Sequence, residues 1–255
     1  MNELLLLSGN DIPFPEAQLT IHPPKLKEIA YIGEEAFFLG CGFLNFSKNL
    51  LSQKDKTNLD NLDDFDIFMT IMINKKKEIK QSIDSALLVL ALLFPLYSIE
   101  VRKDAIVLKK EDEERIINRK NFSAFKNILS SIFCLNLGGT EDKYNPSGDL
   151  AEKIAKKLKK GQEKISQLKH ELKKGKFNVL SRYASILAVG LQKNLNELMQ
   201  YTVYQLYDEL QRFQLKLQWD SYVQARMAGA KDLEEVDNWM IDLKEQGQNK
   251  NKNKK

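Results

Sequence analysis

Residues 86–108 read ALLVLALLFPLYSIEVRKDAIVL and begin with the most apolar run of the chain, 86–97. That run is about 12 residues long, whereas a membrane-spanning helix needs roughly 20. We therefore expect a buried helix in a soluble, cytoplasmic protein rather than a membrane span. The helix is predicted over 79–94, and Pro95 ends it because proline cannot continue a helix.

Strand-like sequence follows this helix directly. Residues 97–101 and 105–108 are β-type runs on either side of Lys103-Asp104, and two such runs around a two-residue polar turn predict a hairpin. Residues 115–117 are expected to add a third strand. We therefore predict a mostly α fold whose N-terminal domain is α+β, with helices and a small antiparallel hairpin.

Further helices are predicted on both sides of the hairpin. Apolar residues recur with helical spacing over 25–44, and acids at the start of 61–74 favour a helix N-terminus there. Asn121 is placed to cap a helix over 122–133. Residues 1–24 are expected to be extended: apolar and polar residues alternate over 17–21, as is typical of a strand, and Pro23-Pro24 ends it.

The sequence changes character at GGTEDKYNPSG, residues 138–148, where turn-forming residues dominate. We place a domain boundary in this segment. It separates an α+β N-terminal domain, 1–137, from an all-helical C-terminal domain, 149–245. The tail 246–255 consists of Lys, Asn, Gln and one Gly, has nothing to bury, and is predicted to be disordered.

Three helices are predicted in the C-terminal domain. The first, 149–174, is rich in Lys, and the second spans 177–193. The third is expected to start at Asn194 or Asn196 and to run to about Ala228, where Gly229 is placed to end it. Its predicted apolar stripe comprises Leu198, Met199, Val203, Leu206, Leu210, Phe213 and Leu217.

The net positive charge comes from the tail. The chain has 39 Lys and Arg against 35 Asp and Glu, and 246–255 holds four of the lysines and no acid. Residues 1–245 are therefore neutral, which argues against a nucleic-acid-binding protein with a basic folded face. The ten lysines of 150–176 keep a nucleic-acid-associated helix open as an alternative. Three acids interleave with them and no Arg or aromatic residue is present to contact bases, so a solvated helix face is the preferred interpretation.

Signatures of catalysis and metal binding are missing from the sequence. It contains no P-loop, glycine-rich dinucleotide turn or nucleophile elbow. His22 and His170 are far apart and have no obvious acid partners, and Cys41 and Cys134 lie in apolar surroundings typical of buried, reduced thiols. The acids of 60–66 lack the glycine and terminal Glu of an EF-hand loop. We predict a non-enzyme without cofactor or metal.

Several stretches of the chain resemble one known family. They are YNPSGDLAEKIAKKLKKGQEKI at 144–165, LSRYASILAVGLQKNLNELMQYTVYQLYDELQRFQLKLQWDSYVQARMAGA at 180–230, EEVDNWM at 234–240 and PEAQLTIHPPKLKEIAYIGEEAFFLGCGFL at 15–44. They are similar to tail assembly chaperones of tailed bacteriophages and prophages, encoded just before the tape measure protein. The resemblance identifies a relative and not a reaction.

The resemblance implies a role in the cytoplasm of the bacterial host. Such chaperones coat the long helical tape measure protein, keep it soluble and pass it to the tail tube protein, and they are absent from the finished particle. Tape measure and tail tube proteins are the implied partners, and a homo-oligomer is left open. The alternatives are the nucleic-acid-associated basic helical protein and a structural virion tail protein that stays in the particle.

A tape measure helix is best held by a stripe of apolar and aromatic side chains. The last helix has more aromatic residues than a small core needs. We predict partner-binding residues near its end, Trp219, Tyr222 and Met227, and after the following turn, Trp239 and Met240. The alternative is that these side chains only pack the last segment against the long helix.

Overall fold

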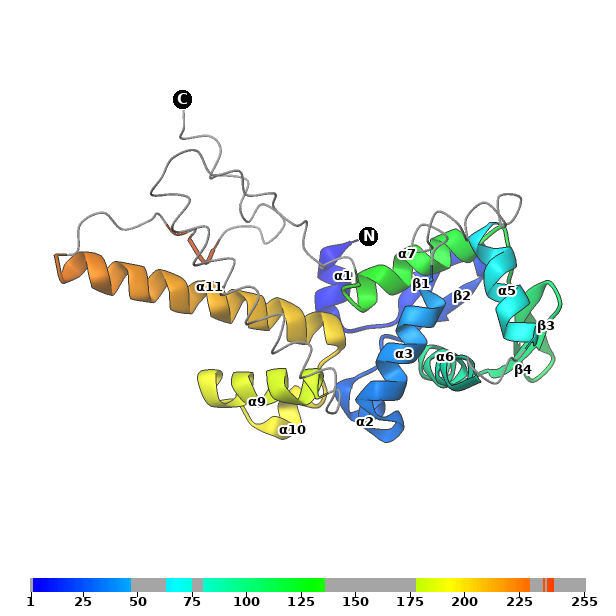
Figure 1. The fold of residues 1–255 in the computed structure, drawn as a ribbon, viewed down its shortest axis with the longest axis horizontal. Coiled ribbons are helices and arrows are strands. Elements are labelled where there is room, and N and C mark those ends of the chain that lie inside the picture. Colours follow the sequence, from blue (N-terminus) through cyan, green and yellow to red (C-terminus); the bar gives the residue numbers. More distant parts are fainter. Residues whose placement is uncertain are drawn as a thin grey trace, which may run out of the picture.

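The computed structural model describes residues 2–46, 63–74, 80–135, 178–229, 236 and 238–240. It is mostly helical, as predicted, and has two small antiparallel sheets, of which the three-stranded one contains the predicted hairpin. Figure 1 shows the sheets and most helices gathered at one end, while the last helix, α11, projects toward the other. None of the described helices is both long enough and apolar enough to cross a membrane.

The N-terminal segment is only partly extended. Its elements are α1 (Glu3–Ser8), β1 (Ile12–Phe14), the 3-10 turn η1 (Pro15–Ala17) and β2 (Leu19–Ile21), with β1 and β2 antiparallel. The prediction of extended backbone was wrong for α1. Asn2 begins this helix by accepting a hydrogen bond from the Leu4 N–H (3.0 Å), and Gly9 ends it with a φ of 66°.

The predicted helix over 25–44 is confirmed as two helices, α2 (Leu26–Ile32) and α3 (Glu34–Leu44). Gly33 separates them with a φ of 84°, which a residue with a side chain rarely adopts. Helix α3 lies tightly against α6 (Lys80–Leu93) at Gly40, where a Cβ would overlap the Ser85 carbonyl. Glycine is therefore needed at both positions, for different reasons.

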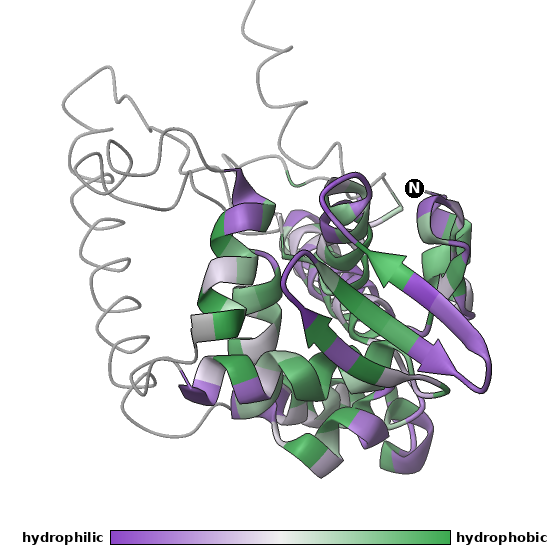
Figure 2. Cartoon of the chain, turned by 90° about the vertical axis from the view of Figure 1, so that its right-hand side faces the viewer, coloured by the Kyte–Doolittle hydropathy of each residue, from purple (hydrophilic) through white to green (hydrophobic). Residues whose placement is uncertain are grey.

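A three-stranded antiparallel sheet follows α6, with the order β3 (Ser98–Arg102), β4 (Ala105–Lys110), β5 (Glu113–Ile117). The hairpin and the third strand are thus confirmed. Figure 2 shows β4 as hydrophobic for most of its length, between two strands that carry more hydrophilic residues. Ile106 and Leu108 of β4 are fully buried in the core, so the central strand fixes this sheet to the helices.

Helix α5 (Asp64–Asn74) begins as the acid-rich start of 61–74 predicts, since the Asp63 carboxylate accepts a hydrogen bond from the Asp66 N–H (2.8 Å). Helix α7 (Phe122–Ile132) was predicted correctly, but Asn121 does not cap it with its side chain. Instead Asn121 accepts from the Asn118 N–H (2.8 Å) and donates to the Ile116 carbonyl (2.9 Å). The Asn121 side chain thus bonds to residues before the helix and stabilises the turn that joins β5 to α7.

The C-terminal helices are α9 (Val179–Leu191), α10 (Leu195–Leu198) and α11 (Val203–Met227). The prediction of one long helix from Asn194 or Asn196 was wrong, because a new helix begins at Thr202. Thr202 and Gln205 form a capping box: the Thr202 Oγ1 accepts from the Gln205 N–H (3.3 Å), and the Gln205 side chain accepts from the Thr202 N–H (2.8 Å). Gly229, with a φ of 83°, follows the end of α11 as predicted.

One continuous core joins the early and late parts of the chain. Buried Leu187 and Leu206 belong to the same cluster as Phe37 and Leu90. At the junction, Glu34 accepts hydrogen bonds from the N–H groups of Leu180 (2.9 Å) and Ser181 (2.8 Å), and so caps α9 from the start of α3. The predicted boundary 138–148, helix 149–174 and tail 246–255 lie outside the described residues, so the division into domains stays a prediction.

Candidate partner-binding site

Among the residues that the structure describes, the tertiary contacts of helix α11 lie along its first half, which we call the inner half, Val203–Leu215. Here Val203, Leu206, Leu210 and Leu215 are buried. The Tyr204 hydroxyl donates to Glu3 (3.0 Å) and the Gln205 amide donates to the Leu7 carbonyl (2.8 Å), so α1 fixes the start of the helix.

The inner half also packs against α9. The rings of Tyr183 and Tyr207 meet edge to face, with centroids 5.5 Å apart. Phe213 lies over Gly190, where a Cβ would overlap its ring. Of the predicted stripe, Leu217 is 50% exposed, and Leu215 is buried in its place. The prediction of Leu217 as a core residue was therefore wrong.

The remaining part of the helix, Lys216–Met227, is the outer half, and none of its side chains is buried. Trp219 and Tyr222 lie side by side, with ring centroids 5.9 Å apart and planes tilted by 36°. The Arg226 guanidinium lies 5.7 Å from the centre of the Tyr222 ring and donates to its hydroxyl (3.2 Å). These three residues form a half-exposed aromatic cluster with one cation, which we call the α11 cluster.

Residues 173–244 match the family model described as the YomV second domain. This is a phage-type family, named for YomV of a Bacillus phage or prophage. The match indicates a phage origin and so agrees with the coarser part of the sequence resemblance. No curated protein and no solved structure matches the chain.

The matched span contains all five predicted binding residues, and the structure brings only some of them together. Trp219 and Tyr222 form the α11 cluster, whereas Met227 lies at the end of the helix and is 84% exposed. Trp239 lies further back, against the inner half, and Met240 beside it is 68% exposed. The predicted set therefore divides between two places on α11.

Trp239 lines a pocket of about 450 Å³ between α1, the end of α9 and the inner half of α11. Residues that the sequence did not single out as binding residues complete it. They are Leu7, Leu191, Tyr201, Gln205, Asp208, Glu209, Arg212, Phe213 and Lys216. Phe213 was predicted as a core residue from its helical spacing. The local sequence does not distinguish an aromatic residue that lines a pocket from one that lies inside a core.

Charged groups around this pocket are mostly paired. The Lys193 ammonium donates to the Tyr201 hydroxyl (2.6 Å) and to the Glu209 carboxylate. Burial raises the pKa of Asp208, although the nearby Arg212 guanidinium opposes the shift. The pocket therefore has an apolar wall, and the charges of the ion pairs around it cancel.

Two cysteines lie among the described residues, and Cys134 is close enough to Asp208 of α11 to interact with it electrostatically. Cys41 is buried and Cys134 half-buried, and both are free thiols. Burial raises the pKa of Cys134 to about 12 and that of Tyr207 to about 12. Both groups therefore stay protonated at neutral pH. A protonated thiol is a poor nucleophile.

The sequence offers no obvious acid partner for His22, whereas the structure places two carboxylates beside it. Its Nδ1 lies 2.8 Å from an Asp11 carboxylate oxygen and its Nε2 lies 3.2 Å from one of Glu28. Glu28 also accepts from the Lys25 N–H (2.7 Å), so the group links β2 to the start of α2. The described residues contain no group of three or more His, Cys, Asp or Glu side chains that could hold a metal ion.

Proposed function

We propose that the chain is a tail assembly chaperone of a tailed phage, which binds the tape measure protein and promotes tail tube assembly without catalysis. The observation that carries the proposal is the match of residues 173–244 to a phage-type family. These residues include most of the sequence that resembles tail assembly chaperones, from Leu180 to Met240. The match supports phage origin, and the chaperone role rests on the resemblance and on the form of α11.

The outer half of α11 suits a long helical client. It combines three features: no buried side chain, an aromatic pair at Trp219 and Tyr222, and an exposed Met227. Aromatic and methionine side chains give large contact areas that adapt to an amphipathic helix. Aromatic side chains of this kind bury about 150–250 Å² each when a partner covers them fully. The α11 cluster is therefore the proposed client contact.

Co-expression with the tape measure protein tests the role. We expect the tape measure protein to be found in the soluble fraction with this chain and in inclusion bodies without it. The double variant W219A/Y222A should lose most of the co-purified client, because both ring surfaces are removed. Y31A is the matched control, since Tyr31 is a 91% exposed aromatic residue on α2 and is not part of the α11 cluster.

The two parts of the proposal fail separately. If the tape measure protein is equally soluble with and without the chain, the chaperone role is wrong. If folded W219A/Y222A still retains the client as the wild type does, only the assignment of the α11 cluster is wrong. Circular dichroism of both variants establishes that they are folded.

We also propose that the chain acts in the host cytoplasm and leaves the finished particle. A structural virion protein is the competing function. Mass spectrometry of purified particles separates them, because a virion protein is recovered in fixed ratio to the tail tube protein. Recovery at that level would overturn the chaperone assignment in favour of the virion protein.

A further inference from the structure

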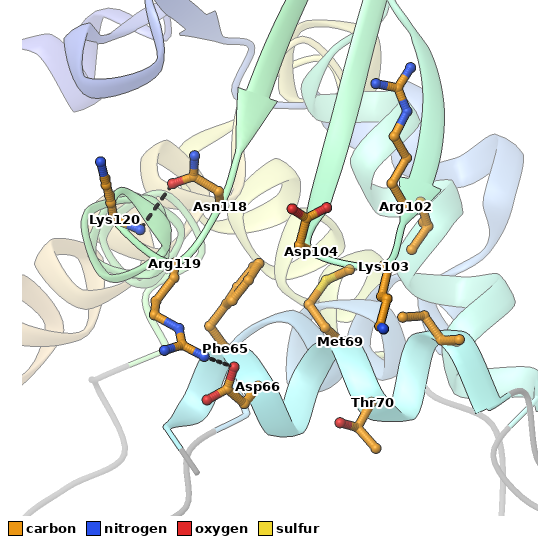
Figure 3. A pocket seen from close by; sticks show the side chains of 12 residues that line it. Phe65, Asp66, Met69, Thr70, Arg102, Lys103, Asp104, Asn118, Arg119 and Lys120 are labelled. Carbon is orange, nitrogen blue, oxygen red and sulfur yellow. Dashed lines mark hydrogen bonds and ion pairs between the residues drawn. The ribbon is translucent and has the colours of Figure 1, made fainter.

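A second concave surface lies along α5, at the end of the molecule opposite the outer half of α11 (Figure 1). Its floor is one face of α5, and its walls are the β3–β4 turn, Arg102–Asp104, and the β5–α7 turn, Asn118–Lys120. Figure 3 shows Phe65 and Met69 rising from α5 toward the ends of the strands, with Lys103 reaching down toward the helix. We call this surface the α5 groove.

The floor of the groove has the spacing of a helix-packing face. Asp66, Met69, Thr70 and Ile73 stand at positions i, i+3, i+4 and i+7 of α5. Met69 is buried, and Ile73, one turn further on, is 44% exposed. An apolar side chain of this size that remains open on a helix face is available to a second helix.

The groove is large enough for a segment of helix. Its volume is about 1080 Å³. Small-molecule sites are typically about 300–1,000 Å³ and enclose most of their ligand. Two turns of a helix about 10 Å in diameter and about 11 Å long fill roughly 850 Å³. The α5 groove can therefore hold about two turns.

The charges of the groove favour an acidic partner. Basic residues Arg102, Lys103, Arg119 and Lys120 outnumber acidic Asp66 and Asp104. The guanidinium groups are already paired, Arg119 with Asp63 and Asp66, and Arg102 with Glu100 and Glu114. Neither the Lys103 nor the Lys120 ammonium has a carboxylate within ion-pair distance among the residues that the structure describes.

We propose that the α5 groove binds an acidic amphipathic helix of a partner protein. Apolar side chains of that helix pack on Met69, Ile73 and Val101, and its carboxylates pair with Lys103 and, at the rim, with Lys120. A nucleic acid fits less well, since the floor is apolar and Asp66 and Asp104 would face its phosphates. This site is independent of the α11 cluster, so either can fail without the other.

The test uses two designed peptides of two heptads each. The first has Leu at helical spacing and Glu elsewhere, and the second has Lys in place of Glu. Methyl NMR of the full chain should show shifts at Met69 and Ile73 with the acidic peptide only. Fluorescence anisotropy should show binding of that peptide weakened roughly tenfold by K103E/K120E, through two lost ion pairs and new repulsion.

Matched variants separate the groove from general charge and apolar effects. K27E/K110E makes the same change of net charge on exposed lysines of α2 and β4, outside the groove, and should leave binding within about twofold of the wild type. I73S should weaken binding roughly fivefold. V189S, which alters an 83% exposed valine of α9, should have no effect.

Three results would overturn the proposal. The first is the absence of shifts at Met69 and Ile73 with acidic peptide up to about 1 mM, the weakest affinity of interest. The second is equal or tighter binding of the Lys peptide or of a single-stranded oligodeoxynucleotide. The third is an equal loss in K103E/K120E and K27E/K110E, which would show that the peptide senses only net charge.

Discussion

The inner and outer halves of α11 differ in what holds them, although they form one uninterrupted helix. The inner half contacts α1 and α9 and contributes buried Leu206 and Leu210 to the core. In the outer half, the interactions shown among the described residues join side chains three or four positions apart, such as Trp219 with Tyr222 and Lys216 with Asp220. Local pairs of this kind stabilise a helix by about 0.2–0.5 kcal/mol each.

The difference indicates how the chain can present a binding helix without a separate scaffold. Tertiary contacts of the inner half fix the direction of the helix, because most helical stability comes from packing. The outer half continues the same helix and leaves its side chains accessible. Substitutions in the two halves should accordingly change different quantities. In the inner half they should lower the free energy of unfolding, and in the outer half they should weaken binding of the partner.

The largest expected effect is that of Leu206→Ala. Leu206 is fully buried, and a cavity at such a site costs about 2–5 kcal/mol. Leu217→Ala in the outer half is the matched change and should cost about 0.5 kcal/mol or less, because this side chain is 50% exposed. Urea unfolding of both variants measures the difference. Equal losses would mean that the outer half is as firmly packed as the inner half.

Gly190→Ala should have the next largest effect. The added Cβ would overlap the Phe213 ring, so either the ring or α9 must move. Such overpacking costs about 1–3 kcal/mol, less the small gain in helix propensity from Ala. The control is Gly42→Ala in α3, where nothing lies within 4 Å of the added atom and stabilisation is expected. Thermal unfolding gives both values, and a stable G190A would show that Phe213 is free to leave α9.

Much of the fold follows from local sequence patterns. The β-hairpin at Lys103-Asp104 and the acidic start of α5 depend on neighbours along the chain, and both were predicted. The break before α11 was missed although Thr202 and Gln205 have the spacing of a capping box. An apolar stripe that continues through 198–203 concealed it. Within α11, Val203, Leu206 and Leu210 keep the predicted spacing, and nothing in the local sequence explains why Leu215 and not Leu217 is buried.

The candidate site was less predictable, because it depends on contacts between distant residues. Trp219 and Tyr222 are neighbours on one helix, and their pairing follows from a spacing of three. The position of Trp239 on the same pocket as Phe213 depends on tertiary structure. So does the cap that Glu34 provides to α9, because its carboxylate comes from another element 146 positions earlier. No pattern in a single sequence identifies such partners.

Glu34→Ala tests this cap, which holds the helix against which the inner half packs. The carboxylate accepts two hydrogen bonds from α9 N–H groups, 2.9 and 2.8 Å long. Loss of a cap of this kind costs about 0.5–2 kcal/mol. Glu35→Ala is the neighbouring control, since Glu35 forms no hydrogen bond or ion pair that the structure shows among the described residues. Hydrogen exchange should show faster exchange at Leu180 and Ser181 in E34A only.

The smallest expected effect is a pH dependence confined to the inner half. Burial raises the pKa of Asp208, so the native state holds this proton more tightly than the unfolded chain. Asp208 therefore opposes folding more as pH rises from the ordinary Asp pKa of about 3.9 through the raised value, and the cost is fully present above it. Asp208→Asn removes the charge, and the stability of this variant relative to the wild type should increase over that window.

Urea unfolding from about pH 3 to pH 7 measures the change, since Asp208 is protonated in both states well below its ordinary pKa of about 3.9. Asp220→Asn in the outer half is the matched variant. Its exposed ion pair with Lys216 contributes about 0.3–0.5 kcal/mol, so D220N should be slightly less stable than the wild type at pH 7. Loss of stability in D208N at neutral pH would show that the Arg212 pair outweighs burial. The inner half would then be held by charge as well as by its apolar core.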